Sequence, residues 1–190
     1  MKGCELESTR LFLTGDPGVG KSTIFLKVVE ELRKRECRVG GFSAPEVRSH
    51  NLRVGFKIVD LVTGEEGWLA RAGAQGRLRV GKYVVIEEDA SKIGVKAIER
   101  ALKECHVVAI DEIGPMELLV ESLKNAIERA IASGKLYLAV VHRRLHEMHP
   151  SLYRTLISQA PIVKVTYENR DLLAFCSSRY AELIASRACL

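Results

Sequence analysis

The sequence predicts an α/β protein with a mostly parallel, five-stranded core sheet and helices on both faces. Two observations support this fold class. Short apolar runs alternate with amphipathic segments along most of the 190 residues. Four of these runs are nearly continuous Val, Ile, Leu and Ala, which is typical of strands covered on both faces. Strands that alternate with helices are joined by right-handed crossovers, so we expect parallel strands in one domain spanning residues 1–190.

Each expected element follows from its own pattern. The core strands are predicted at residues 10–14, 38–44, 106–110, 136–141 and 162–166. Apolar positions spaced three or four residues apart predict helices at 21–36, 90–104, 116–133 and about 170–187. Asp89 is expected to cap the second helix and Gly134 to end the third.

Residues 45–87 depart from this alternation. They contain "VGFKIVDL", "GWLARA" and "GKYVVIEE", separated by the turn-forming stretches "SHN", "TGEEG" and "GAQG". Short strands without intervening helices predict an antiparallel β insertion. Its Trp68 and Tyr83 suit either stacking on a base or filling a small hydrophobic cluster.

Composition limits the classes of function. The net charge of +5 permits contact with polyanions, but the basic residues are spread along the chain and form no tail. The five cysteines have no C-x-x-C spacing, so we expect unpaired thiols in a reducing compartment. No apolar run approaches 18 residues and the first residues lack an apolar signal core, which predicts no membrane span and a cytoplasmic location.

The stretch "GDPGVGKS" at 15–22 fits the pattern G-x-x-x-x-G-K-[ST], with a predicted strand before it and a helix after it. Its glycines allow successive backbone N–H groups to converge on phosphate oxygens, and the helix adds its positive dipole end. Lys21 would reach the β- and γ-phosphates, Ser22 would offer a hydroxyl to Mg²⁺, and Thr23 would lie by the α-phosphate.

The stretch "HVVAIDEIGPME" places two acids directly after a predicted strand. Ligands of parallel α/β sheets bind at the carboxyl ends of strands, so both acids should emerge beside the phosphate cradle. Asp111 suits a Mg²⁺ ligand. Glu112 could accept a proton from water, which favours hydrolysis; a solvated or helix-capping glutamate is the alternative.

Several motifs together resemble the thermophilic nucleoside-triphosphatase family, which includes the cancer-related nucleoside triphosphatase. "FLTGDPGVGKST", "GF…EVR", "VGF", "VGKY", "IDEIGPMEL" and "VTYENRD" occur in the order found in that family and cover about residues 11–173. The resemblance implies a RecA-like P-loop fold and slow, Mg²⁺-dependent hydrolysis of ATP, GTP, CTP and UTP, with Glu112 as the base. By motif it implies these nucleotide-binding positions: Gly15, Asp16, Pro17, Gly18, Val19, Gly20, Lys21, Ser22, Thr23, Val107, Val108, Ala109, Ile110, Asp111, Glu112, Ile113 and Gly114.

The chain departs from the family pattern at three places. It has "APEVR" where "TEEVR" is common, which keeps Glu46 and Arg48 but loses one acid. It has Val141-His142 where "IP" is frequent, and Pro115 where lysine is usual. These differences concern the γ-phosphate sensor and any cationic helper.

Other residues have two interpretations each. Glu117 could orient water or simply favour the first turn of a helix. An arginine could stabilise the transferred phosphoryl group, and Arg143 ranks first because it follows the fourth strand. The further arginine candidates are Arg48, Arg71, Arg77 and Arg79. His142 could approach the γ-phosphate, whereas His146 and His149 fit ordinary polar loops. Asn169 and Arg170 could contact a base or ribose, or Asn169 could cap a helix.

Three functions compete at this stage. Hydrolysis by a monomer leads, because Glu112 could activate water, and the absence of an N/T-K-x-D base-reading motif argues against strict guanine selectivity. A small-molecule or polynucleotide kinase would share the cradle but would need an acceptor pocket and usually a helical lid that carries arginines. A nucleotide-gated RNA-binding switch is compatible with the net positive charge, although no RNA-binding motif supports contact with nucleic acid.

Overall fold

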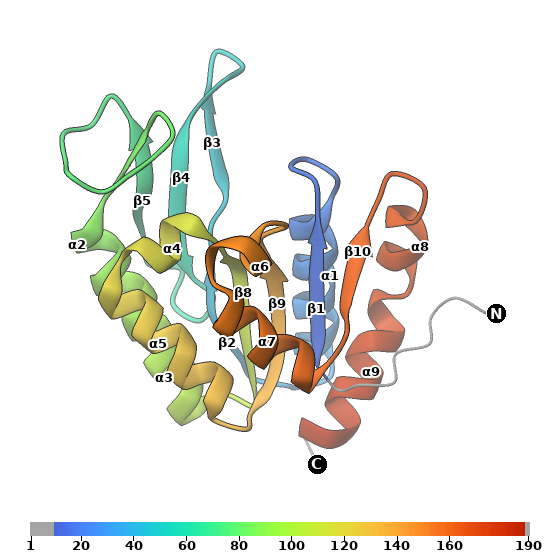
Figure 1. Cartoon of the computed structure of the whole chain (residues 1–190). Helices are drawn as coiled ribbons and strands as arrows, with labels where there is room; N and C mark the ends of the chain where they lie inside the picture. The colour runs from blue at the N-terminus through green and yellow to red at the C-terminus, as the bar shows by residue number, and fades with distance from the viewer. Residues whose placement is uncertain (1–9, 189–190) are drawn as a thin grey trace.

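A ten-stranded sheet runs through residues 10–188, the part of the chain that the computed structural model describes (Figure 1). Its strands are ordered β10-β1-β9-β8-β2-β4-β5-β7-β6, with β3 pairing β4. The first five are parallel: β1 (Leu11–Gly15), β2 (Val39–Ser43), β8 (Val107–Ile113), β9 (Leu136–Val141) and β10 (Ile162–Val165). They coincide with the five predicted core strands, so the predicted fold class is confirmed.

The insertion forms the antiparallel half of the same sheet. Its strands are β3 (Glu46–Ser49), β4 (Leu52–Asp60), β5 (Glu66–Ala72), β6 (Arg79–Val80) and β7 (Tyr83–Val85). It joins the parallel half because β4 pairs antiparallel with β2, with Phe42 opposite Asp60. Asp60 is buried, accepts hydrogen bonds from the backbone N–H groups of Val62 and Thr63, and pairs with Arg100. Its charge is thereby compensated at the junction.

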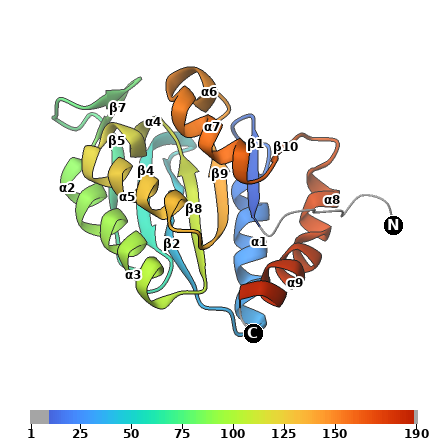
Figure 2. The ribbon, with the colours of Figure 1, turned by 60° about the horizontal axis from the view of Figure 1, so that its bottom comes forward.

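Helices cover both faces of the sheet (Figure 2). One hydrophobic cluster packs α1 (Lys21–Lys34), α8 (Arg170–Phe175) and α9 (Ser177–Ala188) against one face. On the other face lie α2 (Glu87–Asp89), the π-helical segment η1 (Ala90–Val95), α3 (Lys96–Glu104), α4 (Pro115–Leu119), α5 (Glu121–Ala132), α6 (Leu145–Met148) and α7 (Pro150–Gln159). Because successive strand residues face opposite sides, Phe12 belongs to one cluster and its neighbours Leu11 and Leu13 to the other.

Three predicted helix features differ in the structure. The second helix begins at Glu87, and Asp89 does not cap it: its carboxylate accepts a hydrogen bond of 2.7 Å from the backbone N–H of Trp68. The third is divided because Val120, fully buried, takes an extended conformation between α4 and α5. The fourth is divided at Cys176. Gly134, with φ of 74°, does end α5.

The sequence predicted no helix between β9 and β10, and the loop position expected for His146 is wrong. This segment forms α6 and α7, because Leu145, Leu152 and Leu156 are buried in the core and Pro150 begins α7. Four- and ten-residue helices give only a short periodic signal.

The cysteines also differ from expectation. Cys37 and Cys176 are buried and disulfide-bonded, so the prediction of unpaired thiols is wrong for these two. Cys105 is a buried free thiol. Among the described residues, no helix is both long and apolar enough to cross a bilayer.

Candidate active site

The phosphate cradle is the loop that joins β1 to α1. Gly15, Gly18 and Gly20 have φ angles of 150°, 77° and 110°. Residues other than glycine rarely adopt backbone angles in this region. A Cβ at Gly15 would also lie 2.4 Å from the carbonyl oxygen of Val165. The loop can therefore pass close to β10 and turn its N–H groups toward a ligand only with glycine at these positions.

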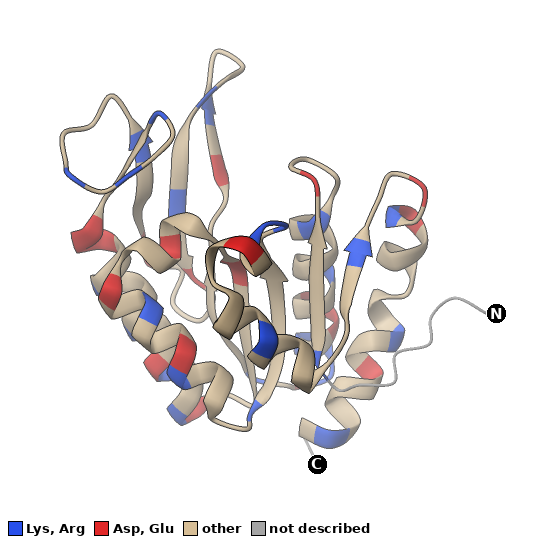
Figure 3. Ribbon diagram, viewed as in Figure 1, with Lys and Arg blue, Asp and Glu red and all other residues tan. Residues whose placement is uncertain are grey.

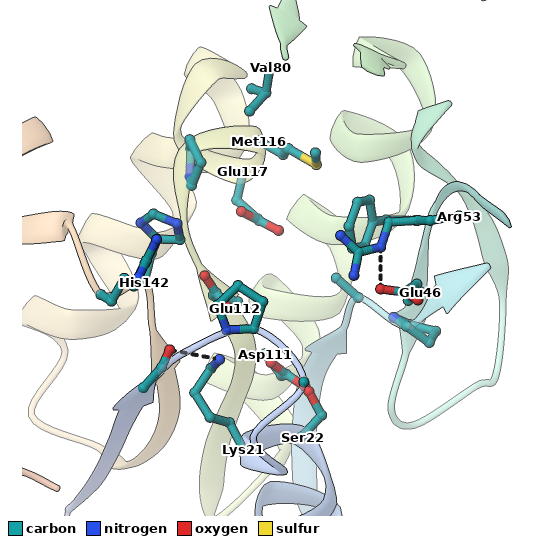
Figure 4. Close-up of a pocket in the computed structure, with 18 of the residues that line it drawn as sticks. Lys21, Ser22, Glu46, Arg53, Val80, Asp111, Glu112, Met116, Glu117 and His142 are labelled. Carbon is teal, nitrogen blue, oxygen red and sulfur yellow. Dashed lines mark hydrogen bonds and ion pairs between the residues drawn. The ribbon is translucent and has the colours of Figure 1, made fainter. Parts of the chain in front are cut away.

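Lys21 is folded back over this loop. Its side chain is buried, and its Nζ donates hydrogen bonds of 3.0 Å to the carbonyl oxygens of Gly15 and Asp16 (Figure 4). The ammonium group thus lies at the cradle, where an incoming phosphate could replace the two carbonyl contacts.

Asp111 and Glu112 come to the cradle from the carboxyl end of β8. Burial raises the pKa of Asp111 to about 6, and the Ser22 hydroxyl and Lys21 oppose this rise. Burial likewise raises the pKa of Glu112 to about 7; Lys21 lowers it and Asp111 raises it. β9 lies between β1 and β8, yet both acids line the same cavity as the cradle. The carboxyl-edge placement expected from the sequence therefore holds.

Glu117 lines the same cavity. It is the third residue of α4 and is only 4% exposed, and its carboxylate accepts hydrogen bonds from the backbone N–H groups of Gly114 and Glu117. Burial and the nearby Glu112 raise its pKa well above the ordinary value. The Glu117 carboxylate therefore stabilises the first turn of α4, as one of the two interpretations expected. It also faces the acid pair (Figure 4).

Ser22 and Asp111 suit a hard divalent cation. The Ser22 hydroxyl hydrogen-bonds the Asp111 carboxylate, so two oxygen ligands already lie side by side at the cradle. No group of three or more His, Cys, Asp or Glu side chains in residues 10–188 could hold an ion by itself. A cation would need further oxygens from phosphate and water, which matches the coordination of Mg²⁺.

The cavity extends from the cradle to the insertion and has a volume of about 690 Å³. At the insertion end its wall contains Phe56, Val80 and Tyr83, of which Val80 is labelled in Figure 4. Phe56 and Tyr83 pack edge to face, with ring centroids 5.5 Å apart. Trp68 lies outside the cavity wall, with the cations of Lys57 and Arg71 4.9 and 5.0 Å from its ring centroid. Of the two aromatic candidates, only Tyr83 could meet a ligand here.

The arginine candidates separate into two groups. Arg143 lines the cavity, and its guanidinium donates a hydrogen bond of 2.7 Å to the carboxylate of Asp16 in the cradle loop. Arg48 does not line the cavity, although it pairs with Glu46, which does. Arg71, Arg77 and Arg79 are exposed on the insertion, whose outer loops carry basic residues in Figure 3.

Arg53 is the cavity cation that sequence reasoning missed. It pairs with Glu46, as Arg48 does, but its guanidinium lies in the cavity, 5.5 Å from the ring centroid of Phe56. Its only sequence signal is its place just before "VGF", at the start of a predicted insertion strand. That pattern does not say which face of the strand meets the cradle.

The histidines take different positions. His142 lines the cavity, and its pKa is lowered first by burial and then by Arg143 and Lys21. A neutral imidazole there could accept or donate a hydrogen bond. His146 lies in α6 near Glu147, and His149 lies between α6 and α7. They form no metal cluster.

Some predicted nucleotide contacts serve the scaffold instead. Val107, Val108, Ala109, Ile110 and Ile113 are fully buried in β8 and packed between the helix layers. None of these five lines the cavity, so the structure gives them a role in positioning the acids, and their direct contact with nucleotide stays a prediction. In the cradle loop, Val19 is also buried and Asp16 points to Arg143.

Comparisons with known proteins agree with this site. Residues 10–176 match the protein family described as NTPase. The chain is 45% identical over 170 residues to the nucleoside-triphosphatase THEP1 of Thermofilum pendens, covering 88% of this chain and 92% of that protein. It is 40% identical over 166 residues to the protein of the same name from Saccharolobus solfataricus, covering 87% and 89%.

Two solved structures share the fold. The crystal structure of THEP1 from the hyperthermophile Aquifex aeolicus aligns with a TM-score of 0.76 at 29% identity, covering 87% of this chain and 95% of the other. The solution structure of a human cancer-related nucleoside triphosphatase aligns with a TM-score of 0.70 at 30% identity, covering 87% and 93%. The family match over residues 10–176 spans the cradle, the acid pair and the insertion.

Proposed function

Since this chain belongs to the NTPase family and is a nucleoside triphosphatase, we propose that it hydrolyses ATP, GTP, CTP and UTP to diphosphates, with Mg²⁺ and slow turnover. The observation that carries the proposal is that Glu112 lines one cavity with Lys21 and Ser22. A carboxylate beside the γ-phosphate position, with a pKa raised to about 7, is suited to accept a proton near neutral pH.

The proposed mechanism relies on positioning and charge. Cradle N–H groups and Lys21 hold the β- and γ-phosphates. A water oxygen attacks the γ-phosphorus, its proton goes to Glu112, and the bond to the β,γ-bridging oxygen breaks. Ser22 and Asp111 would hold Mg²⁺, which supplies positive charge to the phosphate oxygens. The Arg143 guanidinium would leave the Asp16 carboxylate and bind the phosphate. Arg53 could approach the phosphate from the insertion.

Replacing the acid without changing its shape tests the role of Glu112. We expect Glu112→Gln to lower the rate of phosphate release about 10²- to 10⁴-fold while ATP still binds, because the amide cannot accept the proton. Phosphate release and the ATP dissociation constant are both measured, with Mg²⁺ present and no acceptor added. Glu121→Gln, an exposed glutamate on α5, is the matched control and should leave both values unchanged.

A fall of less than threefold in Glu112→Gln would contradict the proposed base. Phosphate release that requires an added alcohol acceptor would instead indicate a kinase. The single domain over residues 1–190, the monomeric state and the cytoplasmic location stay predictions from the sequence.

A further inference from the structure

The loop between β10 and α8 borders the cradle on the side away from the acids. β10 and β9 flank β1, and β8 with its acid pair lies beyond β9. Gly15 pairs directly with Val165 at the end of β10. A Cβ at Gly20 would lie 3.9 Å from Cδ of Arg170. Figure 1 shows this loop next to the loop between β1 and α1.

This loop presents a flat aromatic surface to solvent. Tyr167 is 62% exposed, and the guanidinium carbon of Arg170 lies 5.2 Å from the centroid of its ring. The carboxylate nearest Arg170 is that of Asp171, at 3.7 Å and 93% exposed, so this ion pair is weak. An exposed ring and a guanidinium beside a phosphate cradle offer two planar groups on which a base can stack.

The polar side chains of the loop are already engaged. Oδ1 of Asn169 accepts a hydrogen bond of 2.8 Å from the N–H of Thr166, and its Nδ2 donates one of 2.9 Å to the carbonyl oxygen of Lys164. Glu168 is hydrogen-bonded to Thr166, which lowers the pKa of its carboxyl. Asn169 therefore fixes the loop and is not free to read the edge of a base.

We propose that Tyr167 and Arg170 form the base platform of this enzyme and bind the base of any nucleoside triphosphate by stacking. This inference rests on the proposed function. The acids on β8 fix the γ-phosphate end at one side of the cradle, so the nucleoside end extends toward β10. Every base has a π-face, so a platform that binds by stacking, with Asn169 already engaged, accepts purines and pyrimidines alike. The proposed breadth of substrate thereby gains a physical cause.

The competing location is the insertion end of the cavity, where Phe56 and Tyr83 could also stack on a base. That position lies on the acid side of the cradle. A base there would compete for the space beside the acid pair in which the attacking water must stand. This geometry favours the β10 side.

Removing the ring tests the platform. We expect Tyr167→Ala to raise the KM for ATP and for CTP about tenfold, since stacking on an aromatic side chain typically contributes this much or more to the binding of a base. The inhibition constant of inorganic tripolyphosphate against ATP hydrolysis should change less than twofold, because tripolyphosphate has no base. Tyr167→Phe keeps the ring and should restore the KM for ATP.

The matched control is Phe175→Ala, which removes a 77% exposed ring from the other end of α8 and should change neither constant. The proposal is overturned if Tyr167→Ala raises the KM for ATP no more than Phe175→Ala does, or raises the tripolyphosphate constant equally. It is also overturned if Tyr83→Ala raises the KM for ATP and Tyr167→Ala does not. If Glu112→Gln keeps full hydrolysis while Tyr167→Ala raises the KM, the proposed base fails and the platform stands.

Discussion

The two halves of the sheet contribute to the site in different ways. In the parallel half, β1 and β8 end at the same edge and deliver the cradle and the acid pair from their carboxyl ends. In the antiparallel half, strands run in both directions and deliver single side chains, such as Arg53 and Tyr83, to one wall of the cavity. The parallel half thus provides the phosphate cradle and the acids at the ends of its strands. The insertion provides side chains from one face of its strands, and these form one wall of the cavity.

The two halves of the sheet should also differ in how substitutions affect stability. Parallel strands covered by helices on both faces have no room to adjust, whereas outer loops of the insertion face solvent. We therefore expect substitutions in the parallel half to affect folding and chemistry together. Substitutions in the insertion should affect the cavity wall with less effect on stability.

The largest expected effect is on stability, at Gly41 in β2. Its φ is 120°, and a Cβ there would lie 2.0 Å from the carbonyl oxygen of Ala109 in β8. Gly41→Ala should lower the free energy of unfolding by about 3 kcal/mol or more, because it combines backbone strain with a clash against backbone. Chemical denaturation measures this loss. Since Ala109 precedes Asp111 by two residues, phosphate release should fall as well.

Gly73→Ala in the insertion is the matched control. Gly73 has φ of 75°, but a Cβ there would meet no atom within 4 Å, so we expect a loss of only about 1 kcal/mol. Equal losses in the two variants would show that the insertion is as constrained as the parallel half, and would remove the distinction drawn above.

The same distinction explains what the sequence could predict. Four of the five core strands were predictable because burial on both faces requires continuous apolar runs such as "LFL" and "VVAI", and the alternation with helices indicated the fifth, "RVGGFSA". The meeting of Asp111 with the cradle followed from strand direction alone. Both inferences need only the order of elements along the chain.

Other features depend on packing that no local pattern encodes. Arg53 and Phe56 both line the cavity although they are three residues apart, because the register of β4 on β3 shifts between Arg53 and Gly55, which local alternation does not predict. Glu117 is buried because the α4 segment turns its first helical residues toward the acid pair. The helices α6 and α7 were missed because they are short.

Arg53 tests whether the insertion contributes charge to the reaction. We expect Arg53→Ala to lower kcat/KM for ATP about tenfold, since a hydrogen bond to a charged group typically contributes about 1.5 kcal/mol or more. Steady-state kinetics with ATP measure the change. Arg53→Lys should recover part of the loss, because it keeps the charge but not the planar fork.

Arg48→Ala is the control for this variant, because Arg48 pairs with the same Glu46 but does not itself line the cavity. It should change kcat/KM less than twofold. If both variants lose activity equally, the effect comes from the hairpin fold or from Glu46, and the insertion would then supply shape without charge.

The smallest expected effect concerns the pH dependence of stability, and it arises from the parallel half. The folded-state pKa of Glu117 is raised by burial and by Glu112, so between pH 4.5 and that raised value the native state binds more protons than the unfolded state. The free energy of unfolding therefore falls as pH rises through this window. Asp111, with a pKa of about 6, and Glu112, with a pKa of about 7, act in the same direction.

Glu117→Gln removes one of these three titrations, while its amide oxygen can still accept a backbone N–H bond at the start of α4. At pH 8, without nucleotide and with metal chelated, we expect the variant to be more stable than the parent, because the amide has no charged form to bury. At pH 4.5 the two should differ little, because Glu117 is already protonated in the native state. Urea unfolding at both pH values measures the difference. A variant less stable than the parent at pH 8 would mean that the carboxylate is ionised and well compensated, and the acid cluster would then stabilise the parallel half instead of straining it.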